Sequence, residues 1–312
     1  MLQLLLGGSG SGKTTLLYQR IRARAEKGKK SILLVPEQFT SSTEGRIYRE
    51  LGDALSGMVE SFSFTSLAEK ILSTEGGAAV QTLSDAGRAV LVRRALEELQ
   101  DNVHYYHRHR RSAAFCQMAA QTIDELKSAG LSGRQLAQLA GACGAESGKL
   151  SELALIFQGY ETLLARSGMD PSDRLELAGA RLEEALARHS LPEFLRDRAV
   201  FIDEFDTFNA PKKRLLGAML AALPSVTVAL CDDGAPLLPG DLSLFSGAKQ
   251  VAAQLRQLAR KNGAEVAVPQ LLRKDLRHRN APGLAAVAEL LETGSCTADA
   301  PAGEVRLFAA PS

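Results

Sequence analysis

Residues 2–15 of this chain read LQLLLGGSGSGKTT, and they decide its fold. The apolar run Leu2–Leu6 predicts a buried strand, and the stretch Leu16–Lys27 has the residue spacing of a helix. Between them, Gly7–Thr14 matches the pattern G-x-x-x-x-G-K-[ST] in full. A phosphate-binding loop needs this order of strand, loop and helix. The stretch therefore predicts an α/β protein with a parallel sheet and a nucleotide site at the end of its first strand.

The expected nucleotide-binding residues are those of the loop itself. Its glycines allow positive φ and bring backbone N–H groups close to an anion, and the helix beginning near Lys13 adds its positive dipole end. We expect Lys13 to reach the β- and γ-phosphates, as a catalytic residue, and the Thr14 hydroxyl to ligate Mg²⁺. The alternative is a Gly/Ser-rich turn that happens to contain Lys-Thr, and the flanking strand and helix count against it. The full set comprises Gly7, Gly8, Ser9, Gly10, Ser11, Gly12, Lys13, Thr14 and Thr15.

A second part of the nucleotide site is expected at the end of another strand. The apolar run Arg198–Ile202 is followed directly by Asp203 and Glu204. The carboxyl end of a strand in a parallel sheet lies at the same edge as a phosphate-binding loop. We expect Asp203 to hold Mg²⁺, through water, and Glu204 to be the catalytic general base for the attacking water. A solvated acidic turn after a strand is the alternative for this pair.

The composition indicates a globular chain without a general attraction for nucleic acid. It has 312 residues, 45% of them hydrophobic, with 37 Lys and Arg against 36 Asp and Glu, so DNA contact has to come from local patches. The chain has no long apolar run and enters a strand at once, so we expect a cytoplasmic protein without membrane contact. We expect free thiols, and neither an iron–sulfur cluster nor structural zinc, because the four cysteines are far apart: Cys116, Cys143, Cys231 and Cys296.

The predicted elements divide the chain into three parts. Residues 1–82 alternate strands and helices, as a parallel sheet with crossover helices does. Residues 83–195 have repeated helical periodicity and no convincing strand, which predicts a large all-helical insertion. Residues 196–312 return to the sheet pattern, with late strand candidates at Val266–Val268 and Val305–Phe308. Because the chain ends just after such a candidate, at Ser312, we expect it to be a fragment of a longer protein, truncated at the C-terminus.

Further segments resemble a known family. Val35–Thr40 and Glu60–Ala68, each following a predicted strand, resemble the single-strand-contacting motifs of UvrD-like superfamily-one helicases. The ordered series resembles the N-terminal region of the B subunits of AddAB-type helicase–nucleases and, more distantly, RecB- and RecC-like subunits. The resemblance covers essentially the entire chain, although only the phosphate-loop motif is strong by itself. Four more segments fit the same family: Leu83–Arg88, Ile123–Lys127, Met169–Leu175 and Phe201–Phe208.

The resemblance implies a fold, cofactors and partners. Residues 1–82 and 196–312 would form a RecA-like ATP-binding lobe, and residues 83–195 an inserted helical subdomain. ATP and Mg²⁺ would be the cofactors, and an A-type helicase–nuclease subunit carrying the principal motor would be the partner in a heterodimer. The whole protein would be a subunit of an ATP-dependent DNA helicase and exodeoxyribonuclease that processes double-strand breaks for recombination repair, acting on single-stranded and duplex-end DNA. The family's nuclease domain, with its iron–sulfur cluster, would lie outside this chain.

Two departures from the UvrD-like pattern count against motor activity while leaving ATP binding in place. The segment corresponding to G-D-x-x-Q is Leu230–Pro236, which contains no glutamine, and a glutamine-bearing segment before the loop is missing. An arginine finger would come from a second lobe, so this chain alone is expected to hydrolyse ATP slowly or not at all. Two alternatives stay open: a non-hydrolysing scaffold or DNA-scanning module with a regulatory nucleotide site, and a stand-alone P-loop NTPase.

Candidate DNA contacts fall in two places. Phe62, Phe64 and Thr65 follow a strand end at the ligand edge of the sheet, although the alternation of the two rings also fits the core. Tyr105 and Arg108 belong to the basic and aromatic run 104–111, in which arginines could bind phosphates and a tyrosine could stack on a base. An exposed link between helices, or a subunit contact, is the alternative for that run.

Overall fold

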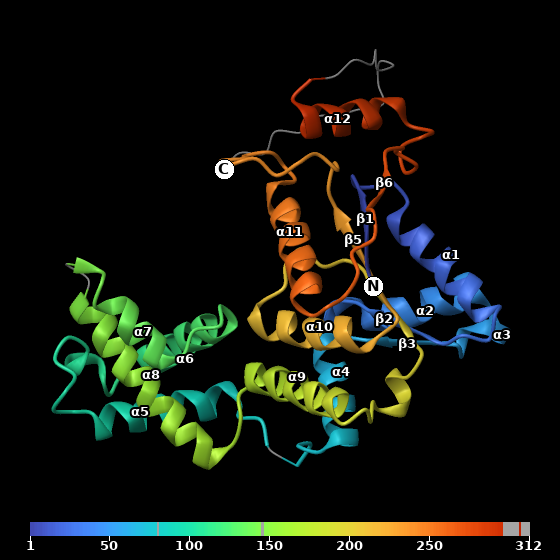
Figure 1. Cartoon of the computed structure of the whole chain (residues 1–312). Coiled ribbons are helices and arrows are strands. Elements are labelled where there is room, and N and C mark those ends of the chain that lie inside the picture. The colour runs from blue at the N-terminus through green and yellow to red at the C-terminus, as the bar shows by residue number, and fades with distance from the viewer. Residues whose placement is uncertain (80, 145–146, 296–305, 307–312) are drawn as a thin grey trace. The chain divides into compact units, whose positions relative to one another are not determined.

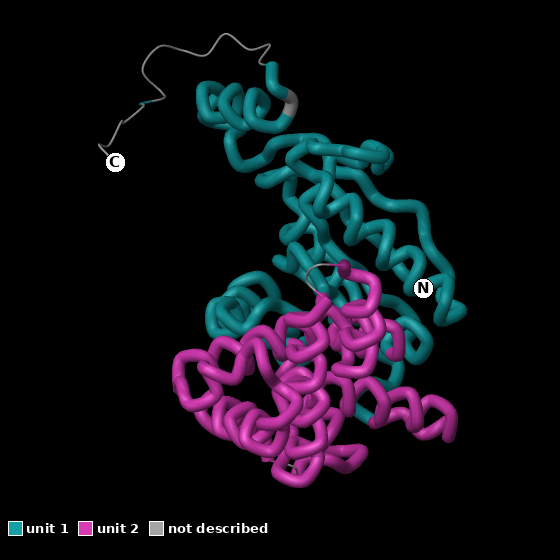
Figure 2. The backbone as a smooth tube through the Cα atoms, turned by 90° about the vertical axis from the view of Figure 1, so that its left-hand side faces the viewer, with its two compact units in different colours: residues 1–63, 193–208, 219–312 teal, residues 64–192, 209–218 magenta. Residues whose placement is uncertain are grey.

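The structure, a computed structural model, describes residues 1–79, 81–144, 147–295 and 306. The chain forms two compact units, coloured separately in Figure 2. Unit 1 comprises Met1–Ser63, Glu193–Phe208 and Met219–Ser312, and unit 2 comprises Phe64–Pro192 and Asn209–Ala218. Each unit is therefore assembled from segments that are distant in the sequence.

Within its described residues, unit 1 contains a six-stranded sheet of order β3-β2-β4-β5-β1-β6 (Figure 1). All neighbouring strands run parallel. Every residue of the two inner strands β2 and β4 is buried, as expected where both faces of a parallel sheet are covered. The strands are β1 (Leu2–Gly7), β2 (Ser31–Leu34), β3 (Val59–Phe62), β4 (Ala199–Ile202), β5 (Ser225–Cys231) and β6 (Gln270–Leu272).

Helices cover both faces of this sheet. The connections from β1 to β2 and from β5 to β6 run in opposite directions along the strand order, so right-handed crossovers place their helices on opposite faces. On one face, α1 (Lys13–Ala25) and α2 (Thr40–Leu51) pack against β-strand side chains such as Leu5 and Phe201. On the other face, α11 (Ser246–Lys261) packs on β1 and β5. The shorter helices of the unit are η1 (Glu37–Phe39), α3 (Asp53–Ser56), η4 (Glu193–Leu195) and α12 (Pro282–Thr293).

The described part of unit 2 is helical, apart from an isolated bridge between Thr82 and Met169. One of its apolar clusters is built around Phe157 and Tyr160, both almost fully buried. The first helix, α4, packs against α9, and α5 packs against α6 and α8. The helices are α4 (Phe64–Glu75), α5 (Asp85–Glu98), η2 (His107–His109), α6 (Ala113–Ser128), α7 (Gly133–Ala140), α8 (Ser147–Ser167) and α9 (Pro171–Ala187), with α10 (Ala210–Ala222) divided between the units after Ala218.

A buried polar cluster joins three helices of unit 2. The Nζ atom of Lys127 on α6 lies 2.8 Å from Asp170 and 2.7 Å from Asp173 at the start of α9. Asp170 is 1% exposed and also accepts a hydrogen bond of 2.6 Å from the Tyr160 hydroxyl on α8. Burial opposes the charge of Lys127, but its bonds to the two carboxylates prevail and raise its pKa. Burial and the bond to Asp170 raise the pKa of Tyr160.

The structure confirms the predicted fold class, an α/β protein with a parallel sheet like that of RecA-like lobes and a large helical insertion. The predicted helix starts at Ser84 and Ser132 are also confirmed, because each serine side chain accepts a hydrogen bond from a backbone N–H of the following turn. No helix of the described residues has the length and apolar content to cross a bilayer.

The last described strand differs from its prediction. Residues 266–268 form no strand, and β6 begins only at Gln270. Val266 makes a single bridge with Leu2, whereas Gln270 is the partner of Leu5, so this side of the ladder holds one residue more than β1 does. The extra residue and Pro269, which lacks a donor N–H, explain the interruption. The candidate strand 305–308 lies, apart from Arg306, outside the described residues.

Candidate nucleotide-binding site

The glycine-rich loop has the backbone shape that its sequence suggests. Gly10 and Gly12 adopt φ values of 80° and 89°, a region that favours glycine, and α1 begins immediately afterwards at Lys13. The Lys13 Nζ atom donates hydrogen bonds to the carbonyls of Gly7 (2.7 Å) and Gly8 (2.8 Å). The ammonium thus folds back over its own loop. Burial lowers its pKa, so an anion that pairs with Lys13 would be favoured at this position.

The acidic pair lies directly beside the loop. Asp203, 6% exposed, follows β4, and its carboxylate accepts a hydrogen bond from the Glu204 backbone N–H at 3.0 Å. The Thr14 side chain is hydrogen-bonded to the same carboxylate. Burial raises the pKa of Asp203, while the bond from Thr14 and the charges of Arg46 and Lys13 oppose this shift. Burial and the neighbouring Asp203 charge raise the pKa of Glu204, a non-glycine residue with a φ of 64°.

One cavity of about 460 Å³ brings the two halves of the expected site together. Its wall is formed by the loop and the start of α1, by the residues after β4, and by the end of β5. Sequence positions about 190 residues apart therefore meet, because β1 and β4 are both neighbours of β5 in the sheet. The lining residues that sequence analysis had singled out are Ser9, Gly10, Gly12, Lys13, Thr14, Thr15, Asp203 and Glu204.

Two arginines of this cavity were not among the predicted site residues. Arg46 comes from α2 and Arg277 from the segment after β6. Arg277 donates to the Ser9 hydroxyl at 3.1 Å, and the neighbouring Leu276 N–H donates to the Gly10 carbonyl at 3.0 Å. A Cβ atom on Gly10 would lie 2.7 Å from the Cβ of Arg277, so only glycine allows this approach. The basic run around Arg277 was a visible signal in the sequence, whereas nothing there distinguished Arg46.

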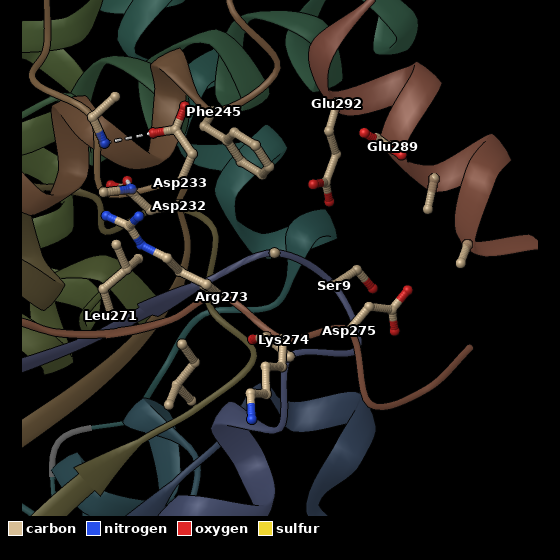
Figure 3. A pocket seen from close by; sticks show the side chains of 18 residues that line it. Ser9, Asp232, Asp233, Phe245, Leu271, Arg273, Lys274, Asp275, Glu289 and Glu292 are labelled. Atoms are coloured by element: carbon tan, nitrogen blue, oxygen red, sulfur yellow. Dashed lines mark hydrogen bonds between the residues drawn. The ribbon is translucent and has the colours of Figure 1, made fainter. Parts of the chain in front are cut away.

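A second cavity, of about 600 Å³, lies on the other side of the loop (Figure 3). Its walls come from the loop, from the residues after β5 and β6, and from α12. Figure 3 shows Glu289 and Glu292 of α12 on one side and Asp232 and Asp233 on the other. Asp232 is 2% exposed; its N–H donates to the Gly7 carbonyl at 3.2 Å. This places the segment after β5, where the UvrD-like pattern would have a glutamine, beside the loop.

The oxygen donors at the loop suit a magnesium ion. The Thr14 hydroxyl and the Asp203 carboxylate are hydrogen-bonded to each other and are hard ligands of the kind that Mg²⁺ prefers. No group of three or more His, Cys, Asp or Glu in the described ranges is arranged to hold a metal. A nucleotide-bound Mg²⁺ needs only one or two protein ligands, since phosphates and waters supply the others. Thr14 and Asp203 would be the residues that hold it.

The first set of candidate DNA contacts is only partly accessible. Phe64 is 3% exposed, so its ring offers no face to a base in this structure. Phe62 is half-buried and packs on Phe194 with 6.5 Å between ring centroids. Thr65, at the start of α4, is exposed. The packing that decides this is long-range, which is why residue alternation alone could not separate contact from core.

The second set lies on a loop held by one carboxylate. Glu152 on α8 accepts hydrogen bonds of 2.8–3.1 Å from the three consecutive backbone N–H groups 104–106. These bonds lower the pKa of Glu152 even though burial acts in the opposite direction. Tyr105 is 55% exposed, with the Lys149 Nζ atom 5.3 Å from its ring centroid, and Arg108 is exposed. The loop thus presents an aromatic ring and positive charge to solvent.

The fold and the loop together define the class: an α/β protein whose RecA-like lobe carries a helical insertion. A family model described as "ADDB, N-terminal" matches residues 4–288, and the chain belongs to this family.

Relatives from three bacteria each carry a name that makes them the B subunit of an ATP-dependent helicase/deoxyribonuclease. The protein of Desulforudis audaxviator is 34% identical over 91% of this chain and 25% of its own length. The corresponding values are 33%, 91% and 25% for Moorella thermoacetica, and 29%, 89% and 24% for Clostridium perfringens. The chain spans about a quarter of the length of the curated relatives it matches.

Proposed function

We propose that this chain binds ATP with Mg²⁺ at the loop between β1 and α1. Lys13 contacts the β- and γ-phosphates, Thr14 and Asp203 hold the metal, and Glu204 faces the water that would attack the γ-phosphate. Gly7–Thr15 supplies the backbone N–H groups around the phosphates. Arg277, through its contact with Ser9, adds a second positive charge at the same loop.

One observation carries this proposal: the hydrogen bond between the Thr14 side chain and the Asp203 carboxylate. A glycine-rich turn without a nucleotide has no need of a buried acid beside it. An acid that is 6% exposed, with burial raising its pKa, costs stability in the free protein. A bound Mg²⁺ would remove that cost by pairing with the carboxylate.

The test is a calorimetric titration of the chain with ATP, with and without Mg²⁺. Lys13→Ala is expected to weaken binding at least tenfold, because a charge-assisted contact to phosphate contributes about 1.5–3 kcal/mol. Lys30→Ala, at an exposed position before β2, is the charge-matched control and should bind like the wild type. Unchanged affinity in Lys13→Ala would refute the assignment of the site.

A regulatory nucleotide site in a non-hydrolysing module is the second candidate. The segment after β5 contains no glutamine, and its buried Asp232 has a carboxylate oxygen 2.6 Å from the Gly234 backbone N–H. That carboxylate is thus engaged within its own turn. ATP binding without DNA-stimulated turnover, measured in the complete complex, would favour this candidate. A stand-alone NTPase would instead turn over ATP without a partner or DNA.

For the whole protein we propose the role that the names of its relatives describe, a B subunit of an ATP-dependent helicase and deoxyribonuclease. It would act with an A-type subunit on single-stranded and duplex-end DNA during recombination repair. A cytoplasmic location fits the free thiols of Cys116, Cys143 and Cys231. Co-purification of the full-length protein with a second large subunit tests this assignment, and a full-length protein that remains alone would contradict it.

We further propose that Tyr105 and Arg108 contact single-stranded DNA, with Phe62 and Thr65 as lesser candidates. The exposed Tyr105 ring and the three arginines of the run 104–111, which has no acidic residue, support this. Tyr105→Ala is expected to weaken oligonucleotide binding about five- to hundredfold in fluorescence anisotropy, since stacking contributes about 1–3 kcal/mol per base. Tyr48→Ala, at another exposed tyrosine, is the control. Equal affinity of all three proteins would overturn this contact.

A further inference from the structure

Arg46 occupies a position in the candidate nucleotide site that no sequence motif assigns to it. It lies on α2 and lines the 460 Å³ cavity together with Lys13, Thr14 and the acidic pair. It also lines an adjoining cavity that contains Thr14, Tyr18 and the same acidic pair. The side chain therefore faces the end of the site where the metal-binding and water-activating groups are expected, rather than the glycines of the loop.

An aromatic ring supports the Arg46 side chain in this position. The guanidinium carbon lies 5.1 Å from the ring centroid of Tyr18, a residue of α1 that is 4% exposed. Burial raises the pKa of Tyr18 to about 12, so the ring stays neutral and is a favourable surface for a cation. Stacking of this kind leaves the N–H donors at the edge of the guanidinium available to a ligand.

The charges around Arg46 are those of a site that lacks its anion. Its positive charge opposes the raised pKa values of both Asp203 and Glu204, so it lies within electrostatic reach of the pair. Among the described residues, however, no carboxylate lies within the 4.0 Å of a salt bridge to Arg46. An arginine that shares a cavity with two carboxylates without pairing to either is open to a further negative partner.

We propose that Arg46 contacts the terminal phosphate of a bound nucleoside triphosphate and makes the site selective for triphosphates over diphosphates. This rests on the proposed ATP site and deepens it. Lys13 and the loop N–H groups hold the phosphates near the start of α1, and the acidic pair marks the end where a γ-phosphate and its Mg²⁺ would lie. A diphosphate would end before this point and leave Arg46 without a contact. The lobe would thus supply from its own helix a cation that phosphoryl-transfer sites otherwise receive from a neighbouring domain.

The test compares the affinities of the whole 312-residue chain for adenylyl imidodiphosphate and for ADP, each with Mg²⁺, by calorimetry. Arg46→Ala is expected to weaken triphosphate binding about ten- to hundredfold, the loss expected for a charged hydrogen bond, and diphosphate binding less than about twofold. Arg46→Lys should lose part of this selectivity, because lysine keeps the charge without the planar fork. Arg22→Ala is the control, since Arg22 is exposed on α1 and pairs with Glu26.

The outcomes separate this inference from the proposed function. If Lys13→Ala binds both nucleotides as the wild type does, the ATP site itself is wrong. If Lys13→Ala weakens both while Arg46→Ala leaves the ratio of the two affinities unchanged, only the role of Arg46 is wrong. An equal loss of both nucleotides in Arg46→Ala would also overturn it, because the residue would then act on the shape of the site. Should Arg46→Ala fail to fold, Arg46→Lys provides the same comparison.

Discussion

Replacing Lys127 by methionine would remove the positive charge from the buried cluster of unit 2 while keeping most of the side-chain volume. The Lys127 side chain is 12% exposed and lies 2.8 Å from Asp170, which is 1% exposed. Without the ammonium, Asp170 keeps only its bond from Tyr160 and its position at the start of α9. Asp173, which is 29% exposed, can be solvated in part.

The expected loss follows from this burial. Removing one partner of a buried ion pair costs about 3–5 kcal/mol, because it leaves a desolvated charge without compensation. For a unit of this size, about 3 °C of melting temperature correspond to 1 kcal/mol, so we expect a decrease of about 9–15 °C. Because the pKa of Lys127 is raised, the pair stabilises the fold below the ordinary lysine pKa. This contribution is lost only as the pH rises through the raised value.

The assay is hydrogen exchange with mass spectrometry, which reports the two units separately. Peptides from α6, α8 and α9 should exchange faster in Lys127→Met, and peptides from the sheet of unit 1 should not change. The double variant Lys127→Met with Asp170→Asn should recover most of the loss, because asparagine is also a good helix N-cap and carries no charge. A loss below about 1 kcal/mol, or a double variant as unstable as the single one, would refute the buried-charge reasoning.

Three further predictions concern the loops and the candidate site. Glu152→Gln should speed amide exchange at residues 104–106, because three N–H groups lose a charged acceptor, a loss of about 1 kcal/mol or more; unchanged exchange would contradict the clamp. Asp203→Asn should raise the free energy of unfolding at pH 7 by about 0.5–2 kcal/mol and abolish Mg²⁺-dependent nucleotide binding. Because burial raises the pKa of Asp203, this gain should fade as the pH falls below the ordinary aspartate pKa, and a gain that persists in acid would refute its cause. Gly12→Ala should cost about 1–2 kcal/mol in urea unfolding for its φ of 89°, as Gly28→Ala should at a φ of 70°, but only Gly12→Ala should also weaken nucleotide binding.

Local sequence determined the elements and the character of the loop. The phosphate-loop pattern is a short contiguous motif, and its positive φ values at Gly10 and Gly12 follow from residue type. Helix starts at Ser84 and Ser132 were predictable for the same reason, because a cap depends on residues within one turn. The alternation of apolar runs with helical periodicity predicted the parallel sheet and the helical insertion, since each pattern reflects the burial of a single element.

Only the tertiary structure decided which of these elements meet. It placed Asp203 beside Thr14, brought Arg46 and Arg277 into the same cavity, and buried Phe64 while leaving Tyr105 exposed. These contacts join residues far apart in the chain, and they depend on strand order and crossover direction, which no local pattern encodes. The sequence by itself therefore determined that a phosphate loop would form. The chemistry around that loop was decided by the order in which the strands pack, because that order selects the side chains that share its edge of the sheet.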